Sequence, residues 1–328
     1  MNKYVLLVAG FFALSSSVAF AQKPKSIFKT GHSKSRKLYG ASNDKTKTIG
    51  FSAGMGIASY FGEMCETGDC FSESKAQMNL GFRYRFRNNM SAKAEVQWYR
   101  IGGRDRRYSG GKLNETDRTN RNLSFRSDNY EITTAFQFDL FPNTKFFEPY
   151  SQRRAFNVYG IIGIGVSAYF PQAYYMDKTG NSEPRWYYLR ELRTEGKKYG
   201  VFTPILPMGI GARYKLSPTL DLAAEVAYRF TTTDYLDDVS GKHVSKSYFE
   251  TAPIPDDKRH IAAALSDRRP EIGALPMPAG VIRGDNSTND GYYIISAKIE
   301  YTFTEGRYNK VKKQRMLKKY RRKVPRYR

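Results

Sequence analysis

The chain has 328 residues, a formal net charge of +23 and a mean hydropathy of −0.61. Beyond residue 21 no stretch approaches the roughly 18 consecutive apolar residues of a membrane-spanning helix, which excludes a helical membrane bundle. A membrane β-barrel is not excluded, because only alternate residues of its strands face lipid. The high counts of Tyr (25) and Phe (21) suit the aromatic girdles of such barrels.

Residues 1–21 have the pattern of a secretory signal peptide. Lys3 precedes an apolar stretch, Tyr4–Leu14, and Ala19–Ala21 forms an A-x-A cleavage site. Cleavage before Gln22 predicts an exported bacterial protein, and no Cys follows the site to carry a lipid anchor. Residues 22–47 contain eight Lys/Arg and one acidic residue without hydrophobic periodicity. They predict a flexible basic periplasmic arm.

Between residues 48 and 304, eight stretches alternate apolar and polar residues with a period of two, which is typical of β-strands. They are Ile49–Tyr60, Ala76–Phe86, Ala92–Ile101, Tyr130–Leu140, Phe156–Val166, Leu206–Tyr214, Thr219–Phe230 and Tyr293–Phe303. In Thr219–Phe230, one face carries Asp, Glu and Arg interleaved with Ala, and the other is apolar and ends in aromatic residues. This pattern indicates a polar interior and lipid outside. We therefore predict an all-β fold, an eight-stranded antiparallel transmembrane β-barrel, over 48–304.

The connections between these stretches alternate between short and long. Inner turns are expected at 87–90, 142–154 and 215–219, of which the middle one is longer than usual, and outer loops at about 64–75, 103–127, 171–200 and 235–290. Outer-membrane barrels have short periplasmic turns and long extracellular loops. We expect this barrel in the bacterial outer membrane, surrounded by its lipid, with both termini in the periplasm.

The predicted inward face carries seven basic and six acidic side chains. The basic ones are Arg83, Arg85, Lys93, Arg213, Lys215, Arg229 and Lys298, and the acidic ones are Glu95, Glu131, Asp139, Asp221, Glu225 and Glu300. The interior of an eight-stranded barrel is just wide enough for its side chains to fill. Long ionic side chains are expected to occupy the space beside inward-facing Gly. A salt-bridged, closed interior is therefore expected, and a small passive channel is disfavoured.

Cys65 and Cys70 lie in a polar, Gly-containing loop segment. In an exported protein such a close pair is most simply a disulfide, with free thiols as the alternative. A metal site would need further ligands, and the surrounding sequence supplies no His or third Cys.

Five segments resemble the Bacteroidetes DUF6089 family of outer-membrane barrels. They are Ile49–Glu63 (IGFSAGMGIASYFGE), Asn122–Ser127 (NLSFRS), Leu192–Gly196 (LRTEG), Thr233–Gly241 (TDYLDDVSG) and Ala264–Arg268 (ALSDR). The resemblance covers nearly the whole chain between the two terminal segments. The family includes PorG-like proteins of the type IX secretion and gliding machinery. The resemblance thus implies a non-enzymatic, anchoring barrel that links the membrane to a periplasmic ring, with no cofactor.

The internal motifs of this resemblance fall in the predicted outer loops. Their charged residues could pair and lock the loops, or could form a cap that binds a partner; locking is favoured because long exposed loops need internal pairing to be ordered. The candidate pairs join Arg126, Arg193 and Arg268 to Asp234, Asp237, Asp238 and Asp267. Clustered carboxylates at 234, 237 and 238 also suit calcium, although EF-hand spacing is absent.

An enzyme is the alternative class. His243 and His260 share the last loop with Asp256, Asp257 and Ser266, which could in principle supply a nucleophile, a base and an orienting group. No motif holds these residues in a fixed geometry, and residues 256–267 indicate an amphipathic loop helix instead. No catalytic residue is therefore assigned.

Residues 305–328 contain twelve Lys/Arg and one Glu, whereas the body over 48–304 carries only +4. The positive charge thus lies in two terminal segments, and no nucleic-acid partner is expected in the periplasm. The basic tail predicts an electrostatic tether to a ring protein, anionic lipid or cell-wall carboxylates, or else a solvated extension. The tether residues are Lys310, Lys312, Lys313, Arg315, Lys318, Lys319, Arg321, Arg322 and Lys323.

Overall fold

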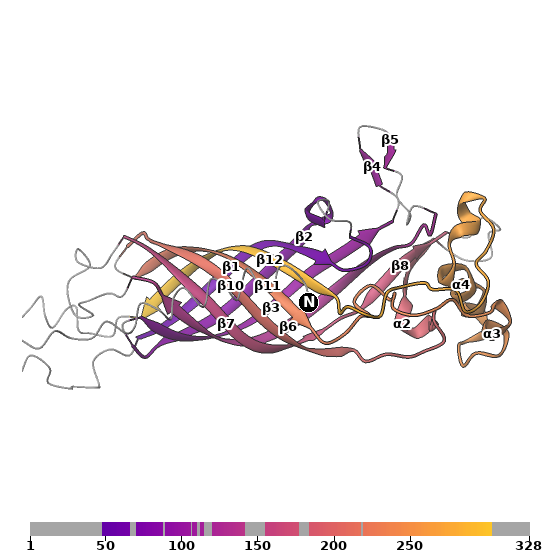
Figure 1. Ribbon diagram of the computed structural model, residues 1–328. Helices are drawn as coiled ribbons and strands as arrows, with labels where there is room; N and C mark the ends of the chain where they lie inside the picture. The colour runs from indigo at the N-terminus through magenta and orange to yellow at the C-terminus, as the bar shows by residue number, and fades with distance from the viewer. Residues whose placement is uncertain are drawn as a thin grey trace, which may run out of the picture. The chain divides into compact units, whose positions relative to one another are not determined.

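The computed structural model describes residues 48–65, 70–87, 89–105, 107–109, 112–114, 120–141, 155–176, 184–217 and 219–303. Eight long strands form the barrel drawn in Figure 1. They are β1 (Thr48–Phe61), β2 (Lys75–Arg85), β3 (Met90–Arg104), β6 (Ser124–Asp139), β7 (Phe156–Ala168), β10 (Phe202–Lys215), β11 (Leu220–Thr231) and β12 (Gly291–Phe303).

Every barrel strand pairs antiparallel with two neighbours, in the order β3-β2-β1-β12-β11-β10-β7-β6. Pairing of β3 with β6 closes the sheet, so the barrel has no free edge. Ile49 is opposite Phe303, so the start of β1 and the end of β12 lie together at one end of the barrel. The predicted closed, eight-stranded antiparallel fold is confirmed.

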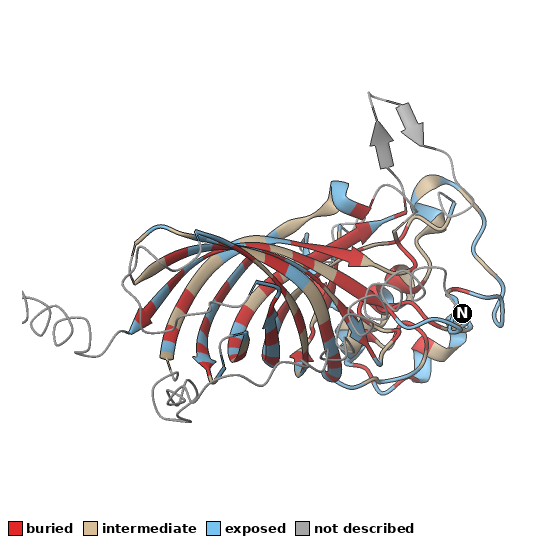
Figure 2. Ribbon diagram, turned by 60° about the vertical axis from the view of Figure 1, so that its left-hand side comes forward, coloured by how far each residue is buried: buried red, intermediate tan, exposed pale blue. Residues whose placement is uncertain are grey.

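Buried and exposed residues alternate along the barrel strands, as the bands of Figure 2 show. In β11, Asp221, Glu225 and Arg229 are buried, whereas Leu222 and Val226 are exposed. Charged side chains thus point inward and apolar ones outward, the reverse of a water-soluble barrel. The exposed belt includes Met55, Met78, Leu80, Phe82, Val96, Ile132, Phe136, Ile164, Ile210 and Ile299. This apolar exterior makes the fold a transmembrane barrel.

Within the described part of the chain, no helix is long and apolar enough to cross a membrane.

The strands extend further toward the long loops than predicted. β3 continues to Arg104 and β6 begins at Ser124, six residues before the predicted Tyr130. Residues 124–129 are mostly polar on both faces, so the alternation that marks a lipid-facing strand is absent there. The ladder nevertheless continues, with Arg104 opposite Ser124. The backbone pairing of β3 with β6 therefore extends beyond the residues that alternate between apolar and polar.

The long loops contain regular elements of their own. The predicted loop 171–200 holds β8 (Pro171–Tyr175), which pairs with β6, then β9 (Arg185–Tyr188) and α2 (Leu189–Leu192). The last loop holds α3 (Lys246–Thr251), α4 (Asp256–Ser266) and η3 (Arg269–Ile272). The other elements are η1 (Cys70–Glu73) and a hairpin of β4 (Arg107–Ser109) and β5 (Lys112–Asn114). The predicted loop helix at 256–267 is confirmed as α4.

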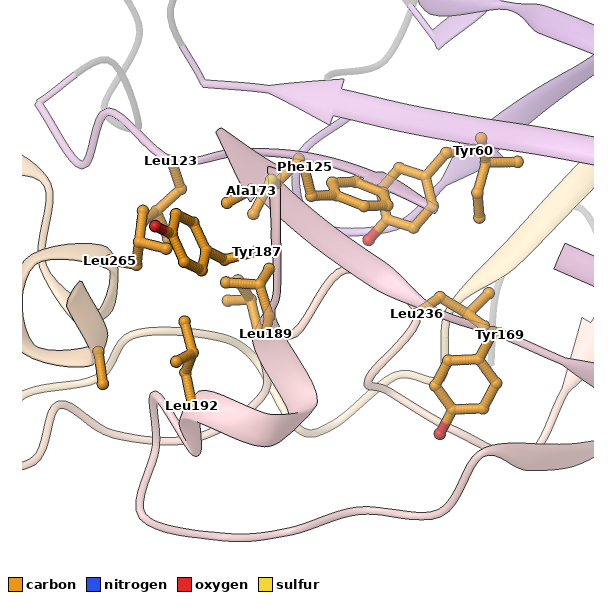
Figure 3. Packing of buried hydrophobic residues seen from close by; sticks show 14 of the residues in the cluster. Tyr60, Leu123, Phe125, Tyr169, Ala173, Tyr187, Leu189, Leu192, Leu236 and Leu265 are labelled. Atoms are coloured by element: carbon orange, nitrogen blue, oxygen red, sulfur yellow. The ribbon is translucent and has the colours of Figure 1, made fainter. Parts of the chain in front are cut away.

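The main hydrophobic core lies among the long loops rather than inside the barrel. We call the long-loop residues that pack there, chiefly 184–201 and 232–290, the cap. Figure 3 shows Leu123, Tyr187 and Leu265 in contact range, with the ring of Phe125 beside that of Tyr60. A smaller cluster, Ala135, Tyr159 and Ile161, faces the barrel interior. Apolar packing, which we did not predict for these loops, orders the cap.

Candidate functional site: a filled interior and a closed cap

The interior charges form layers along the barrel. In the layer nearest the paired chain ends, Arg213 donates to Glu300 at 2.6 Å and lies 3.2 Å from Asp139. Arg83 lies 3.2 Å from Glu300, and Arg85 lies 3.1 Å from Asp139. Each carboxylate is therefore shared by two guanidinium groups. This compensates part of the cost of withdrawing the charges from water.

The middle layer joins two lysines to two glutamates. Lys93 Nζ lies 2.8 Å from Glu225 Oε2 and 2.9 Å from Glu95 Oε2. Lys298 contacts the same two carboxylates. The Tyr159 hydroxyl donates to the other Glu225 oxygen at 2.9 Å. A compact group of four alternating charges therefore crosses the barrel.

The layer nearest the cap is built around Glu131, which is fully buried. Glu131 accepts hydrogen bonds from the Tyr292 hydroxyl at 2.7 Å and from the Gln97 amide, and Arg229 lies 3.5 Å away. Tyr292 stacks on Tyr99 with ring centroids 4.7 Å apart. Aromatic rings and one ion pair thus fill this level.

Ten of the thirteen predicted inward charges, spread over β2, β3, β6, β11 and β12, are buried. They are Arg83, Arg85, Lys93, Glu95, Glu131, Asp221, Glu225, Arg229, Lys298 and Glu300. Arg213 and Asp139 are also buried, whereas Lys215 lies half-buried at the end of β10.

Long side chains fill the space beside inward-facing glycines, as predicted. A Cβ atom on Gly54 would lie 2.6 Å from Lys298 Cγ, and one on Gly81 would lie 2.7 Å from Glu95 Cγ. At Gly211 it would lie 2.4 Å from the Tyr159 ring. The glycines thus make room for the charged and aromatic side chains. Side chains therefore occupy the bore at each of the three layers.

Arg283, which sequence reasoning missed, joins several segments of the cap. Its side chain is 3 % exposed and lies 2.9 Å from Glu195 and 3.7 Å from Asp238. It also donates to the backbone carbonyls of Asp238 and Ser266 at 2.5 and 3.1 Å. One buried guanidinium therefore ties α4 and the 233–241 segment to the residues after α2.

Arg121, also missed, joins the cap to the barrel rim. It makes a two-pronged contact with Asp105 at 2.8 and 2.9 Å, just after β3. It lies 3.5 Å from Glu63, just after β1, and donates to the Arg283 carbonyl at 2.7 Å. No local motif marks either arginine, because their partners are distant in the sequence.

The predicted pairing of three arginines with four aspartates is wrong, because the arginines contact other residues. Arg126 donates to Gln172 at 3.3 Å and lies over the Trp186 ring, 3.9 Å from its centroid. Arg268 pairs with Glu271 at 2.9 Å. β8, β9 and η3 supply these neighbours, which therefore take the place of the predicted aspartates.

Arg193 ends α2 in the left-handed conformation, with φ 46°, and no ion pair of its side chain is found among the described residues.

The predicted aspartates are instead held by hydroxyl and amide donors. Asp238 accepts from the Thr194 and Tyr199 hydroxyls. Asp267 accepts from the backbone N–H groups of Arg269 and Met277 at 3.1 and 2.7 Å. These contacts lock the loops as expected, but mainly through neutral donors and Arg283.

Asp234 differs from the other aspartates of the cap. It is 8 % exposed, and neither carboxylate oxygen has a hydrogen-bond partner within the described residues, although Ser240 lies close by. Burial, partly offset by Ser240 and reinforced by Asp237, raises the pKa of Asp234 to about 7. The described residues contain no group of three His, Cys, Asp or Glu placed to hold a metal ion. The calcium hypothesis at 234, 237 and 238 therefore gains no support.

The candidate catalytic residues do not converge. His243 is buried, and burial together with Arg283 lowers its pKa, whereas His260 is exposed beside the Tyr175 ring. Asp256 and Asp257 begin α4 and Ser266 ends it, so they are separated by roughly 15 Å along the helix. The Ser266 hydroxyl donates to the Ala263 carbonyl. Among the described residues no hydroxyl–histidine–carboxylate arrangement forms from this set.

A disulfide joins Cys65 to Cys70, as predicted. The signal peptide, the basic arm and the whole basic tail over 305–328 lie outside the described residues. Their predicted roles remain predictions.

No protein-family model matches the chain, and no curated relative is found. Several solved outer-membrane proteins are similar to it at low identity. Neisserial surface protein A is 10% identical with a TM-score of 0.36, and covers 78% of this chain with 97% of its own length. Ail of Yersinia pestis is 12% identical with a TM-score of 0.34, and the match covers 78% of this chain and 99% of Ail. A major outer membrane protein of Thermus thermophilus is 10% identical with a TM-score of 0.37, and the match covers 78% of this chain and 99% of that protein. Likeness at this level assigns no ligand, activity or partner.

Proposed function

We propose that this protein is a non-enzymatic anchor in the bacterial outer membrane. The observation that carries the proposal is the filled interior. Paired charges join β2, β3, β6, β10, β11 and β12 across the bore, and the apolar cap closes the long-loop end. Within the described part of the chain, these side chains fill the bore, which argues against a path for solutes or a cavity for a substrate. Its exterior fixes the chain in a bilayer, and its remaining parts are free to bind a partner.

The terminal segments are the proposed partner-binding parts. Residues 22–47 and 305–328 are both strongly basic. The first segment precedes β1 and the second follows β12, and the start of β1 lies beside the end of β12, with Ile49 opposite Phe303. If the long loops are extracellular, the start of β1 and the end of β12 both lie at the periplasmic end of the barrel. The twelve cations of one segment and the eight of the other suit an acidic protein surface. The resemblance to the DUF6089 family makes the type IX secretion and gliding machinery the proposed setting.

Cross-linking in the native membrane tests this proposal. Three chains are compared: the intact protein, a truncation after Thr304, and a full-length chain with the nine tether residues changed to Gln. We expect a periplasmic partner that cross-links to the intact chain and is lost from both variants. The matched control, Leu275→Ala at the exposed face of the cap, should keep it. The same partners in all four samples would rule out the basic tail as the tether.

A further inference from the structure

Tyr60, near the cap end of β1, places its hydroxyl between two aspartates. The phenol oxygen lies 2.7 Å from Asp237 Oδ2 and 2.7 Å from Asp290 Oδ1. All three side chains are at most 2 % exposed. Asp237 belongs to the 233–241 segment and Asp290 immediately precedes β12, so this triad joins two parts of the cap to the barrel rim.

The other oxygens of both carboxyl groups have a matching arrangement. Asp237 Oδ1 accepts from the backbone N–H of Val239 at 2.9 Å, and Asp290 Oδ2 accepts from that of Leu236 at 3.0 Å. A backbone N–H donates and cannot accept a hydrogen bond. A proton on the oxygen that faces Tyr60 has the phenol oxygen as its acceptor, whereas a proton on the other oxygen would lie beside a backbone donor.

The hydrogen bonds of the triad require one proton more than the phenol provides. A tyrosine hydroxyl has one proton and donates one hydrogen bond. If both aspartates were ionised, one of the two 2.7 Å contacts would bring lone pairs together in a buried site. With one carboxyl group protonated, the acid donates to the phenol oxygen and the phenol donates to the remaining carboxylate. Every polar atom of the triad is then satisfied.

We propose that the cap binds one proton at neutral pH, shared by Asp237 and Asp290 through Tyr60, and that transfer of this proton to solvent base at alkaline pH loosens the cap from the barrel rim. After that transfer two carboxylates compete for one phenol proton. Their repulsion separates the 233–241 segment from the start of β12.

The acidic surroundings favour retention of the proton. Glu63 faces Asp237, and Asp234 faces both carboxyl groups of the triad. Burial and these negative neighbours raise the pKa of Asp237 to about 8 and that of Asp290 well above its ordinary value. Because the two aspartates are coupled, the proton belongs to the pair.

The cation that faces Asp237 does not replace the proton. Arg121 faces Asp237, but it is held by the two-pronged contact with Asp105. Tyr228 of β11 faces Asp290 and brings no positive charge. Gly62 approaches the triad so closely that a Cβ atom there would lie 2.0 Å from Asp290 Oδ1 and 2.1 Å from the Tyr60 hydroxyl. The site is thus tightly enclosed and suits a proton, and no metal-binding group is found among the described residues.

Asparagine variants test the proposal on the full-length protein in detergent micelles. In Asp237→Asn or Asp290→Asn, the amide N–H donates to the phenol without titrating. Infrared spectroscopy should detect a protonated carboxyl group in the wild type at pH 7 that disappears as the pH rises to 10. Both variants should lack this titration. Asp234→Asn should retain it, which distinguishes the triad from Asp234.

Loosening of the cap is measured by hydrogen exchange of residues 233–241, compared at each pH with the control Asp256→Asn, which changes an exposed aspartate. Above the transition, the exchange rate of the wild type and of the control is divided by that of the triad variants at the same pH. This ratio should rise by up to about tenfold for each pH unit. The proposal is overturned if the wild type has no protonated carboxyl group at pH 7, if Asp234→Asn alone abolishes it, or if all variants share one exchange profile. Should the triad variants fail to fold, the wild-type and Asp234→Asn spectra decide.

Discussion

Arg213 of β10 donates a 2.6 Å hydrogen bond to Glu300 of β12, although β11 lies between these two strands. Both side chains are buried, at 6 % and 5 % exposure. Removing one partner of a buried ion pair leaves an uncompensated charge, which costs about 3–5 kcal/mol. We expect Glu300→Gln to lower the free energy of unfolding by about 3 kcal/mol, measured by urea unfolding in liposomes with the heat-modifiable gel band as the readout.

The control for this prediction is an ion pair on the barrel exterior. Arg100 lies 2.7 Å from Asp128, and both side chains are partly exposed. Such pairs contribute about 1 kcal/mol or less, because solvent screens them. Asp128→Asn should therefore have a much smaller effect than Glu300→Gln. Equal losses would contradict the interpretation that interior pairing holds the barrel together.

A second prediction concerns the space inside the barrel. Gly211→Ala places a Cβ atom 2.4 Å from the fully buried Tyr159 ring, which is held in turn by Glu225. Overpacking of this kind costs about 1–3 kcal/mol. The unfolding midpoint in urea should fall accordingly. Gly160→Ala is the matched control, since no atom lies within 4 Å of its new Cβ; a fall of the same size there would point to strand propensity instead of crowding.

The third prediction separates the cap from the barrel. Leu236 is fully buried in the cap core, so Leu236→Ala should destabilise the cap by about 2–5 kcal/mol. Protease added to the protein in detergent micelles should then cleave the long loops faster, while the heat-modifiable band of the barrel is unchanged. Leu275→Ala, at a side chain with 83 % exposure, should leave the cleavage rate unaltered. Simultaneous loss of the band would mean that cap and barrel unfold together.

The barrel could be predicted from the sequence because the residues of each strand alternate between polar side chains for the interior and apolar ones for the lipid. In β11, every second residue from Asp221 to Arg229 is charged or Ala, and this local period placed the inward charges correctly. Pairing across the bore then followed from the narrow interior of an eight-stranded barrel.

The cap could not be predicted in the same way. Its core brings together Leu123, Leu192 and Leu265 from three separate loops without a repeating pattern. Arg121 and Arg283 meet although 162 residues separate them in the sequence. The partners of Asp237 and Asp238 depend on tertiary contacts that no local spacing encodes.

The last prediction concerns Asp234, whose buried carboxylate has no hydrogen-bond partner among the described residues. Its pKa is raised to about 7, so the folded protein binds a proton more tightly than the unfolded chain, where an aspartate titrates near pH 4. The contribution of this group to stability is therefore complete below about pH 4 and declines as the pH rises through about 7. The slope is at most about 1.4 kcal/mol per pH unit, and smaller to the extent that water screens the site.

Asp234→Asn removes the ionisation while keeping nearly the same shape. We expect the variant to be more stable than the wild type at pH 8, to be similar to it near pH 4, and to have a flatter dependence on pH between these values. Urea unfolding of the cap, followed by protease cleavage of the long loops, measures the difference. Asp256→Asn is the control, because the exposed Asp256 carboxylate already contacts water and Arg259. A variant less stable than the wild type at pH 8 would show that the ionised Asp234 has a favourable partner in the folded protein.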